Sequence, residues 1–108
     1  PNRMQIFAAF GKFTAVLHER GIMHEDYSMG NILFEPNEQG AQFQLVDLNR
    51  MRFGQNITLR RGCRNFERID TDSAALSAIA RAYAQARGFE EEECVRLVLK
   101  MRWRKHKK

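Results

Sequence analysis

The pattern of apolar and polar positions predicts a helical start, a β-type middle and a helical end. From about Met4 to Arg20, apolar side chains recur at helical spacing. They are Ile6, Phe10, Phe13 and Leu17. Gly21 follows, and glycine commonly ends a helix. We expect one amphipathic helix here, with His18 on its solvent-exposed surface.

Two short apolar runs follow, at residues 32–34 and 43–46, and a polar segment with Pro and Gly separates them. This pattern predicts a β-hairpin with a long loop over residues 35–42. If Leu33 pairs with Leu45, Asn31 lies opposite Asp47. Opposed residues lie ~4.5 to 5.5 Å apart, with side chains on one face. A slip of two residues would separate these two side chains.

Residues 48–70 are rich in arginine and have no sustained period, so we expect an ordered loop with one helical turn near residues 65–69. Two helices then follow. Thr71 or Asp72 supplies the N-cap of the first, and Gly88 ends it. Its apolar stripe is Leu76, Ile79, Ala80 and Tyr83.

The last helix opens with four glutamates at 90–93 and closes with Lys and Arg, in agreement with the helix dipole. We expect it to bury Cys94, Leu97, Val98 and Met101. The elements together predict an α+β fold, mostly α. With 108 residues and 12.6 kDa, the chain fits one small domain.

The formal net charge of +5 is a property of the C-terminal end. Residues 96–108 carry seven basic side chains and no acid, and the other 95 residues have a net charge of −2. The body is therefore nearly neutral. The aromatic residues also do not alternate with Lys or Arg, so the sequence argues against a nucleic-acid partner.

Cys63 and Cys94 lie 31 positions apart without the spacing of a zinc site, and we expect reduced thiols. No run of 18 apolar residues and no signal-peptide pattern occurs, which favours a cytoplasmic protein. Pro1 stands where an initiator Met is expected, which suggests a chain processed or cut from a longer one.

The most informative segment is residues 24–31, His-Glu-Asp-Tyr-Ser-Met-Gly-Asn, together with Asp47 at the end of the second strand. In the proposed register, the Asn31 amide and the Asp47 carboxylate converge, which suits Mg²⁺ held with phosphate oxygens. Asp26 beside them can accept a proton from a hydroxyl or orient it for attack on a phosphoryl group. We expect His24 inside, holding the loop by hydrogen bonds, and Gly30 at a turn that a side chain would obstruct.

The spacing H-x-D-x-x-x-x-N, followed by an apolar strand and an apolar-apolar-Asp, resembles the catalytic loop and metal-binding Asp of protein-kinase-like enzymes. More narrowly, HEDYSMGNILFE and FQLVDLNRMRF resemble the Kdo/heptose lipopolysaccharide kinase family. The resemblance implies ATP and Mg²⁺ as cofactors and a sugar of the lipopolysaccharide inner core as substrate. It also implies Asp26 as catalytic base, Asn31 and Asp47 as Mg²⁺ ligands, and His24 as loop organiser.

The chain departs from protein kinases at two motifs. Asp47-Leu48-Asn49 stands in place of Asp-Phe-Gly, and Glu25 stands in place of the Arg of His-Arg-Asp. The second change removes the usual partner of an activation-loop phosphate. No Ala-Pro-Glu segment follows, which also points away from protein substrates.

Only 23 residues precede the motif, and they hold no G-x-G-x-x-G loop and no strand Lys in V-A-I-K context. Because kinases of this type need an N-terminal lobe to cover the nucleotide, residues 1–108 are expected to correspond to the C-terminal lobe alone. As an isolated fragment, we expect it to bind ATP weakly and to turn over negligibly.

Five arginines follow Asp47, at Arg50, Arg52, Arg60, Arg61 and Arg64. They are either solvated loop residues or contacts for anionic sugar carboxylates or phosphates. Trp103 and the basic tail, residues 102–108, suit either the inner face of a membrane or a solubilising terminus. The alternative function is a non-catalytic kinase-like relic or small module that binds acidic lipid, nucleic acid or a protein.

Overall fold

The computed structural model describes residues 2–102 and confirms the first predicted helix as α1, Arg3–Glu19. Asn2 caps its start, because its side chain accepts a hydrogen bond from the Gln5 N–H. The Gln5 side chain accepts in turn from the Asn2 N–H at 2.8 Å. This capping box satisfies two amide groups that would otherwise lack partners, and so defines where the helix begins.

The predicted hairpin is present as β2, Ile32–Asn37, and β3, Gly40–Leu45, but two details of the prediction are wrong. The strands run through the polar positions, since backbone pairing does not require apolar side chains, and Asn37 pairs with Gly40 across a two-residue turn. Leu45 pairs with Ile32 and not with Leu33, a difference of one residue. Asn31 therefore does not lie opposite Asp47.

The arginine-rich segment contains more regular structure than predicted. A short 3-10 helix η2, Leu48–Arg50, leads into β4, Met51–Arg52, which pairs antiparallel with β1, Met23–His24. A helix that the sequence did not predict, α2, Leu59–Arg64, precedes the predicted turn. The predicted helical turn near residues 65–69 is present, and the Ile69 N–H donates to the Phe66 carbonyl oxygen at 3.0 Å. The Thr58 side chain caps α2 by accepting from the Arg61 N–H.

Both predicted C-terminal helices are confirmed. The first is α3, Ser73–Arg87, capped by Asp72 and ended by Gly88 in the left-handed conformation (φ 77°). The second is α4, Glu91–Met101, where the Glu90 carboxylate accepts from two backbone N–H groups of the first turn. Local signals were sufficient to predict these helices, because a capping residue and the helical spacing of apolar residues both operate within one or two turns.

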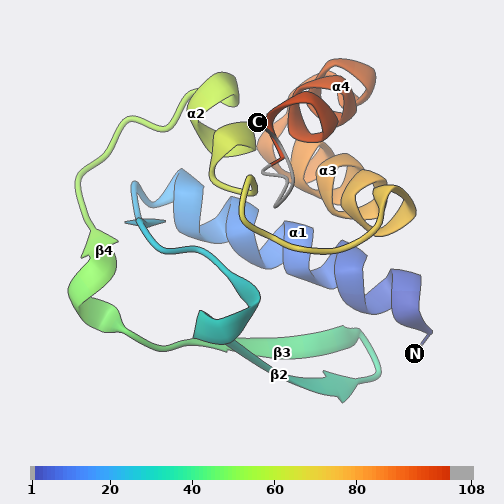
Figure 1. Cartoon of the computed structure of the whole chain (residues 1–108), viewed down its shortest axis with the longest axis horizontal. Coiled ribbons are helices and arrows are strands. Elements are labelled where there is room, and N and C mark those ends of the chain that lie inside the picture. Colours follow the sequence, from blue (N-terminus) through green and yellow to red (C-terminus); the bar gives the residue numbers. More distant parts are fainter. Residues whose placement is uncertain (1, 103–108) are drawn as a thin grey trace, which may run out of the picture.

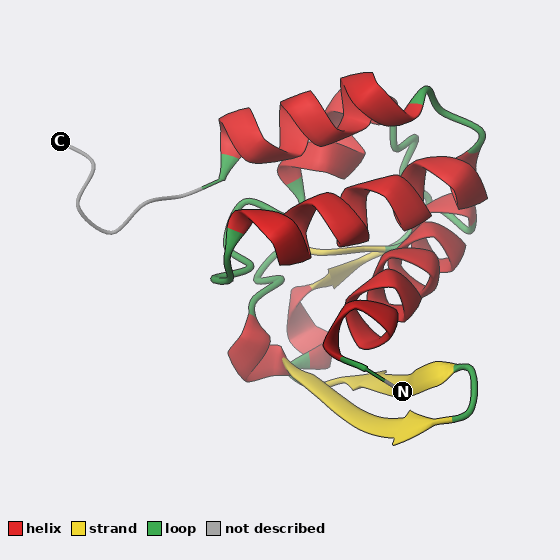
Figure 2. Cartoon of the chain, turned by 90° about the vertical axis from the view of Figure 1, so that its right-hand side faces the viewer, coloured by secondary structure: helices red, strands yellow, loops and turns green. Residues whose placement is uncertain are grey.

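The helix α1 lies at the centre of the molecule, with the β2–β3 hairpin along one side and α3 along another (Figures 1 and 2). The helix α4 packs against α3, and α2 lies beside α4. A Cβ added at Gly11 would overlap the Ile79 carbonyl oxygen, so glycine permits the close approach of α1 to α3. Among residues 2–102, no helix is both long and apolar enough to cross a membrane.

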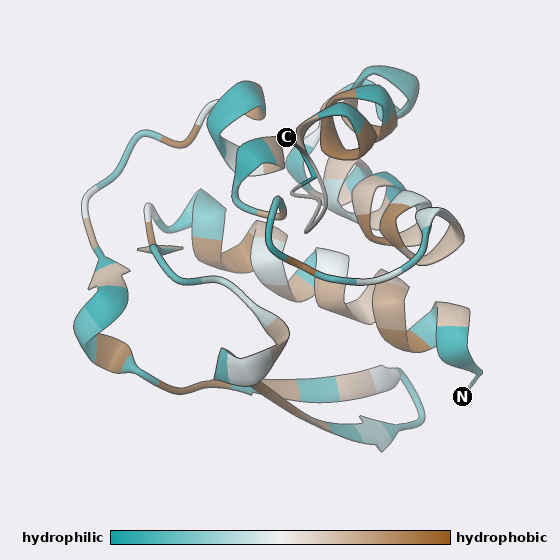
Figure 3. Ribbon diagram, viewed as in Figure 1, coloured by the Kyte–Doolittle hydropathy of each residue, from teal (hydrophilic) through white to brown (hydrophobic). Residues whose placement is uncertain are grey.

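Apolar and polar segments alternate along the helices, as Figure 3 shows, and the apolar faces form one core. Phe66 and Tyr83 lie at its centre in edge-to-face contact, with ring centroids 5.1 Å apart. The predicted α3 stripe is fully buried. Cys63 and Cys94 are both buried as free thiols, as expected, with sulfur atoms 3.4 Å apart.

Candidate functional site

Asp26 and Asn31 are joined by hydrogen bonds within the predicted catalytic loop. The Asn31 Nδ2 donates to the Asp26 carbonyl oxygen (2.8 Å) and to its carboxylate Oδ2 (3.1 Å). Because both partners only accept, the orientation of the amide is determined, and its oxygen Oδ1 is turned away from Asp26. Asn31 itself ends a short 3-10 helix η1, Met29–Asn31, which leads directly into β2.

The buried His24 ring holds this loop together, as the sequence predicted for its position. Its exposed fraction is 1%. The Asp26 N–H donates to its Nδ1 at 3.0 Å, so Nδ1 is unprotonated and Nε2 carries the proton. Nε2 then donates to the Val46 carbonyl oxygen at 2.9 Å. One imidazole therefore ties the Asp26 loop to the residue before Asp47.

Asp47 is offset by one residue from the position opposite Asn31, because Val46 lies there. The Val46 N–H donates to the Asn31 carbonyl oxygen at 3.0 Å, which brings the next residue, Asp47, to the end of this ladder. Among residues 2–102, Asp47 is the only residue other than glycine with positive φ (φ 61°, ψ 57°). The left-handed backbone conformation is uncommon for residues other than glycine, and residues held in it cluster at functional sites. Its side chain is exposed.

A second anchor holds the loop from within the core. The Tyr27 hydroxyl lies 2.6 Å from the Thr14 Oγ1, which itself donates to the Phe10 carbonyl oxygen at 3.0 Å. Because the Thr14 hydroxyl uses its one proton for Phe10, the Tyr27 hydroxyl is the donor to Thr14. Burial raises the pKa of Tyr27, which favours this protonated form. The loop therefore rests on α1 at the residue next to Asp26.

Two expectations for this region are wrong. His18 is buried (3% exposed) and not at the surface, with Nδ1 2.7 Å from the Tyr83 hydroxyl and Nε2 2.9 Å from the Asn65 Oδ1. The sequence held a signal for this, since His18 continues the spacing of Phe10 and Thr14 along one face of α1. The turn at Gly30 does not require glycine, contrary to the expectation that a side chain would obstruct it. Its φ is not positive, and a Cβ there would meet nothing within 4 Å.

Asn65 is a residue that the sequence did not single out. It lies at the C-cap of α2, and its Nδ2 donates to the His24 carbonyl oxygen at 3.0 Å while its Oδ1 faces His18. No local pattern pointed to it, because its two partners are 47 and 41 positions away. It thus connects the helical core with the loop of His24 and Asp26.

The five predicted arginines occupy different environments. Arg50, Arg61 and Arg64 line a cleft of about 390 Å³ together with Glu25 and Glu67. Arg61 is positioned by the Asn56 carbonyl oxygen (2.6 Å) and by the Gln55 side chain (2.9 Å).

The other two predicted arginines do not line this cleft. Arg52 forms an exposed ion pair with Glu25 at 3.0 Å. Arg60 is exposed on α2.

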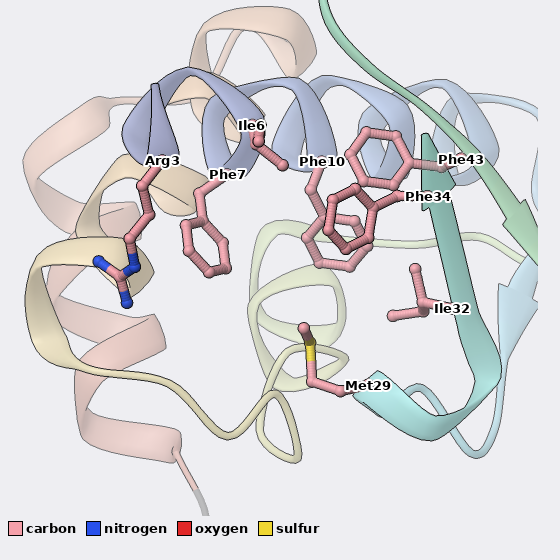
Figure 4. A pocket seen from close by; sticks show the side chains of 8 residues that line it. All are labelled: Arg3, Ile6, Phe7, Phe10, Met29, Ile32, Phe34 and Phe43. Carbon is pink, nitrogen blue, oxygen red and sulfur yellow. The ribbon is translucent and has the colours of Figure 1, made fainter. Parts of the chain in front are cut away.

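A separate, apolar pocket of about 340 Å³ lies between the first half of α1 and the hairpin (Figure 4). Its wall is almost entirely apolar, and the Arg3 guanidinium stands at one end, 2.8 Å from the Asp72 carboxylate. The lining residues are Arg3, Ile6, Phe7, Phe10, Met29, Ile32, Phe34 and Phe43. This pocket presents mainly apolar side chains, whereas the loop of Asp26 presents polar ones.

The described residues contain no cluster of three or more His, Cys, Asp or Glu side chains that could hold a metal. The predicted Mg²⁺ ligands, Asp47 and Asn31, are one carboxylate and one amide, so they fall outside that definition. Amide and carboxylate oxygens are nevertheless the donors that Mg²⁺ takes in sites it shares with phosphate and water.

The match to a protein family covers most of the chain. The lipopolysaccharide kinase (Kdo/WaaP) family model matches residues 2–98. No curated protein and no solved structure matches the chain. The chain belongs to the lipopolysaccharide kinase (Kdo/WaaP) family, which confirms the resemblance seen in the sequence and indicates a kinase-like function with a sugar substrate.

Proposed function

We propose that residues 1–108 form the catalytic lobe of an ATP- and Mg²⁺-dependent kinase that phosphorylates a sugar hydroxyl of the lipopolysaccharide inner core. One observation carries the proposal. The His24 ring bonds both to the Asp26 N–H and to the carbonyl oxygen that precedes Asp47. The loops of the proposed base and of the proposed cation ligand are thus held as one unit before any ligand binds.

Asp26 is the proposed catalytic base. Its Oδ2 accepts from Asn31, which orients the carboxylate and leaves Oδ1 to accept the proton of a sugar hydroxyl. Asn31 Oδ1 and the Asp47 carboxylate are the proposed Mg²⁺ ligands, because both are oxygen donors not used in the bonds described above. Mg²⁺ bound there would neutralise charge on the phosphoryl group being transferred.

A magnesium titration followed by NMR tests this assignment. In the wild-type chain we expect Mg²⁺ to shift the side-chain amide signal of Asn31. Asp47→Asn removes one charged ligand and should abolish that shift, whereas Asp70→Asn, an exposed Asp between α2 and α3, should retain it. An unchanged response in Asp47→Asn would contradict the proposed site and support the non-catalytic alternative.

We propose that the 108-residue chain by itself binds ATP weakly and turns over negligibly. The support is in the sequence, which contains no Gly-rich loop and no strand Lys to hold the phosphates. Phosphoryl transfer from ATP to a sugar by the purified chain alone would contradict the proposal.

The arginine-lined cleft is the proposed contact for anionic groups of the sugar. Arg50, Arg61 and Arg64 line this cleft together with Glu25 and Glu67, which leaves a formal charge of +1 among its charged side chains. The planar guanidinium group suits carboxylate and phosphate. We expect Arg64→Ala to weaken binding of a sugar phosphate, with Arg96→Ala on α4 as the control. Equal affinity in both variants would leave these arginines as solvated loop residues.

We propose a cytoplasmic location at the inner face of the membrane for this chain. Trp103 and the other residues of 103–108 lie outside the described residues, so the support is compositional: an aromatic residue followed by cations. Vesicles with anionic lipid should retain the full chain and release a chain lacking residues 102–108. Salt-sensitive binding of nucleic acid through the same residues would instead support the alternative module.

A further inference from the structure

We propose that Asn65 is a positioning residue for the proposed catalytic loop, and that it holds this loop through a directed hydrogen-bond relay from Arg87 to His24. The functional meaning of the loop rests on the proposed function, but the relay itself rests on the geometry alone. Asn65 bonds at once to the His24 carbonyl oxygen and to the His18 ring, and so joins the loop to α1.

The direction of every bond in the relay follows from chemistry. The His24 carbonyl only accepts, so Asn65 presents its Nδ2 to it and its Oδ1 to His18. His18 must then carry its proton on Nε2, and its Nδ1 accepts from the Tyr83 hydroxyl at 2.7 Å. The Tyr83 oxygen accepts from the Arg87 Nη1 at 2.7 Å.

The relay is built as a rigid unit. Arg87 is itself fixed, since its other nitrogens donate to the Glu19 carboxylate and to the Ile57 carbonyl oxygen. Tyr83 is fully buried and His18 nearly so, so water cannot readily replace these bonds. Burial lowers the pKa of His18 to about 4, which keeps the ring neutral and the direction of the relay unchanged at neutral pH.

The relay ends where the proposed site begins. Asn65 holds the carbonyl group of His24, and the ring of the same residue holds the Asp26 N–H and the Val46 carbonyl oxygen. Movement of the His24 main chain would therefore displace the segments of Asp26 and Asp47 together. This is the sense in which Asn65 acts through another residue and not on substrate.

Hydrogen exchange of the full 108-residue chain tests the proposal. Asn65→Asp keeps the size and the oxygen facing His18 but replaces the donor to the His24 carbonyl with an acceptor. We expect the Asp26 amide to exchange about tenfold faster or more, relative to amides of α4, because a buried carbonyl loses its partner. A merely structural role would accelerate both sets of amides equally, as we expect for Val98→Ala in the core of α4.

A second measurement remains decisive if Asn65→Asp does not fold. The ¹⁵N spectrum of the wild-type imidazole rings reports which nitrogen of His18 carries the proton. The relay requires Nε2, and a proton on Nδ1 would overturn it. Neither readout involves Mg²⁺ or ATP, so the two proposals can be tested separately. The relay can be contradicted while the wild-type chain still responds to magnesium, and the magnesium response can be absent while the relay is confirmed.

Discussion

The His24 Nε2 donates to the carbonyl oxygen of Val46 at 2.9 Å, across 22 positions of the chain. This bond decides the relative position of the two segments that carry Asp26 and Asp47. The Val46 N–H is also occupied, by the Asn31 carbonyl oxygen. Both backbone groups of the residue before Asp47 are therefore held by residues of the proposed catalytic loop.

Replacing His24 is expected to loosen both segments at once. In His24→Leu, the Val46 carbonyl and the Asp26 N–H lose their partner, and we expect a loss of about 2–4 kcal/mol in the free energy of unfolding. Urea unfolding measures this loss, and amide spectra should show changes at both Asp26 and Asp47. The control Leu97→Ala also destabilises the core but should leave those two signals in place. A change confined to Asp26 would contradict the clamp.

The stability of the protein should depend on pH through His18. Burial lowers its pKa to about 4 in the folded state, against 6.5 for an ordinary His. Between pH 6.5 and 4, the unfolded chain binds a proton at His18 that the folded chain excludes, so stability falls as the pH falls through this window. The full contribution is present above pH 6.5, and the loss approaches ~3 kcal/mol near pH 4.

Urea unfolding at a series of pH values checks this dependence. His18→Gln lacks the titrating ring and should show a flatter curve between pH 6.5 and 4 than the wild-type chain. Equal slopes for both proteins would mean that the pKa of His18 is not lowered in the folded state.

Two glycines should respond in opposite ways to the same substitution. A Cβ at Gly62 would overlap the Tyr83 hydroxyl, so Gly62→Ala should destabilise the fold by about 1–3 kcal/mol and disturb the His18 contact. A Cβ at Gly30 meets nothing within 4 Å, so Gly30→Ala should change stability by less than about 0.5 kcal/mol. Denaturant midpoints compare the two, and a large loss in Gly30→Ala would restore the turn role first expected there.

The ion pair between Glu25 and Arg52 should contribute little to stability. Both side chains are about half exposed, at 43% and 50%, so solvent and salt screen their interaction. A double-mutant cycle with Glu25→Ala and Arg52→Ala should give a coupling energy below about 1 kcal/mol that decreases further in high salt. A coupling of several kcal/mol would assign the pair a larger part in holding β4 beside β1.

The helices were predictable because their signals are local. The Asp72 cap, the apolar stripe of α3 and the left-handed Gly88 all lie within one element, and each was confirmed. The hairpin was only half predictable. Ile32, Leu33 and Phe34 are all apolar, so the alternation that determines register in a half-buried strand is absent. In the structure only Ile32 of these three residues is buried, and Leu33 and Phe34 are half exposed.

His18 shows why the remaining contacts were hidden from sequence reasoning. An isolated histidine on a helix suggested a surface residue, yet its partner Tyr83 lies 65 positions away. Asn65 is equally unremarkable in sequence, at the end of a short helix. The contacts of both residues depend on the close approach of α1 to α3 and on the position of α2 beside them.

The sequence by itself determined the order of His24, Asp26, Asn31 and Asp47, the three long helices and the family to which the chain belongs. Motif order and helical period are properties of neighbouring residues, so they can be read without a fold. Only the tertiary structure decided the hairpin register, the left-handed backbone of Asp47 and the relay through Asn65. These features depend on packing, which brings side chains that are distant in the sequence within hydrogen-bond distance of one another. Once such polar groups are buried, each needs a hydrogen-bond partner.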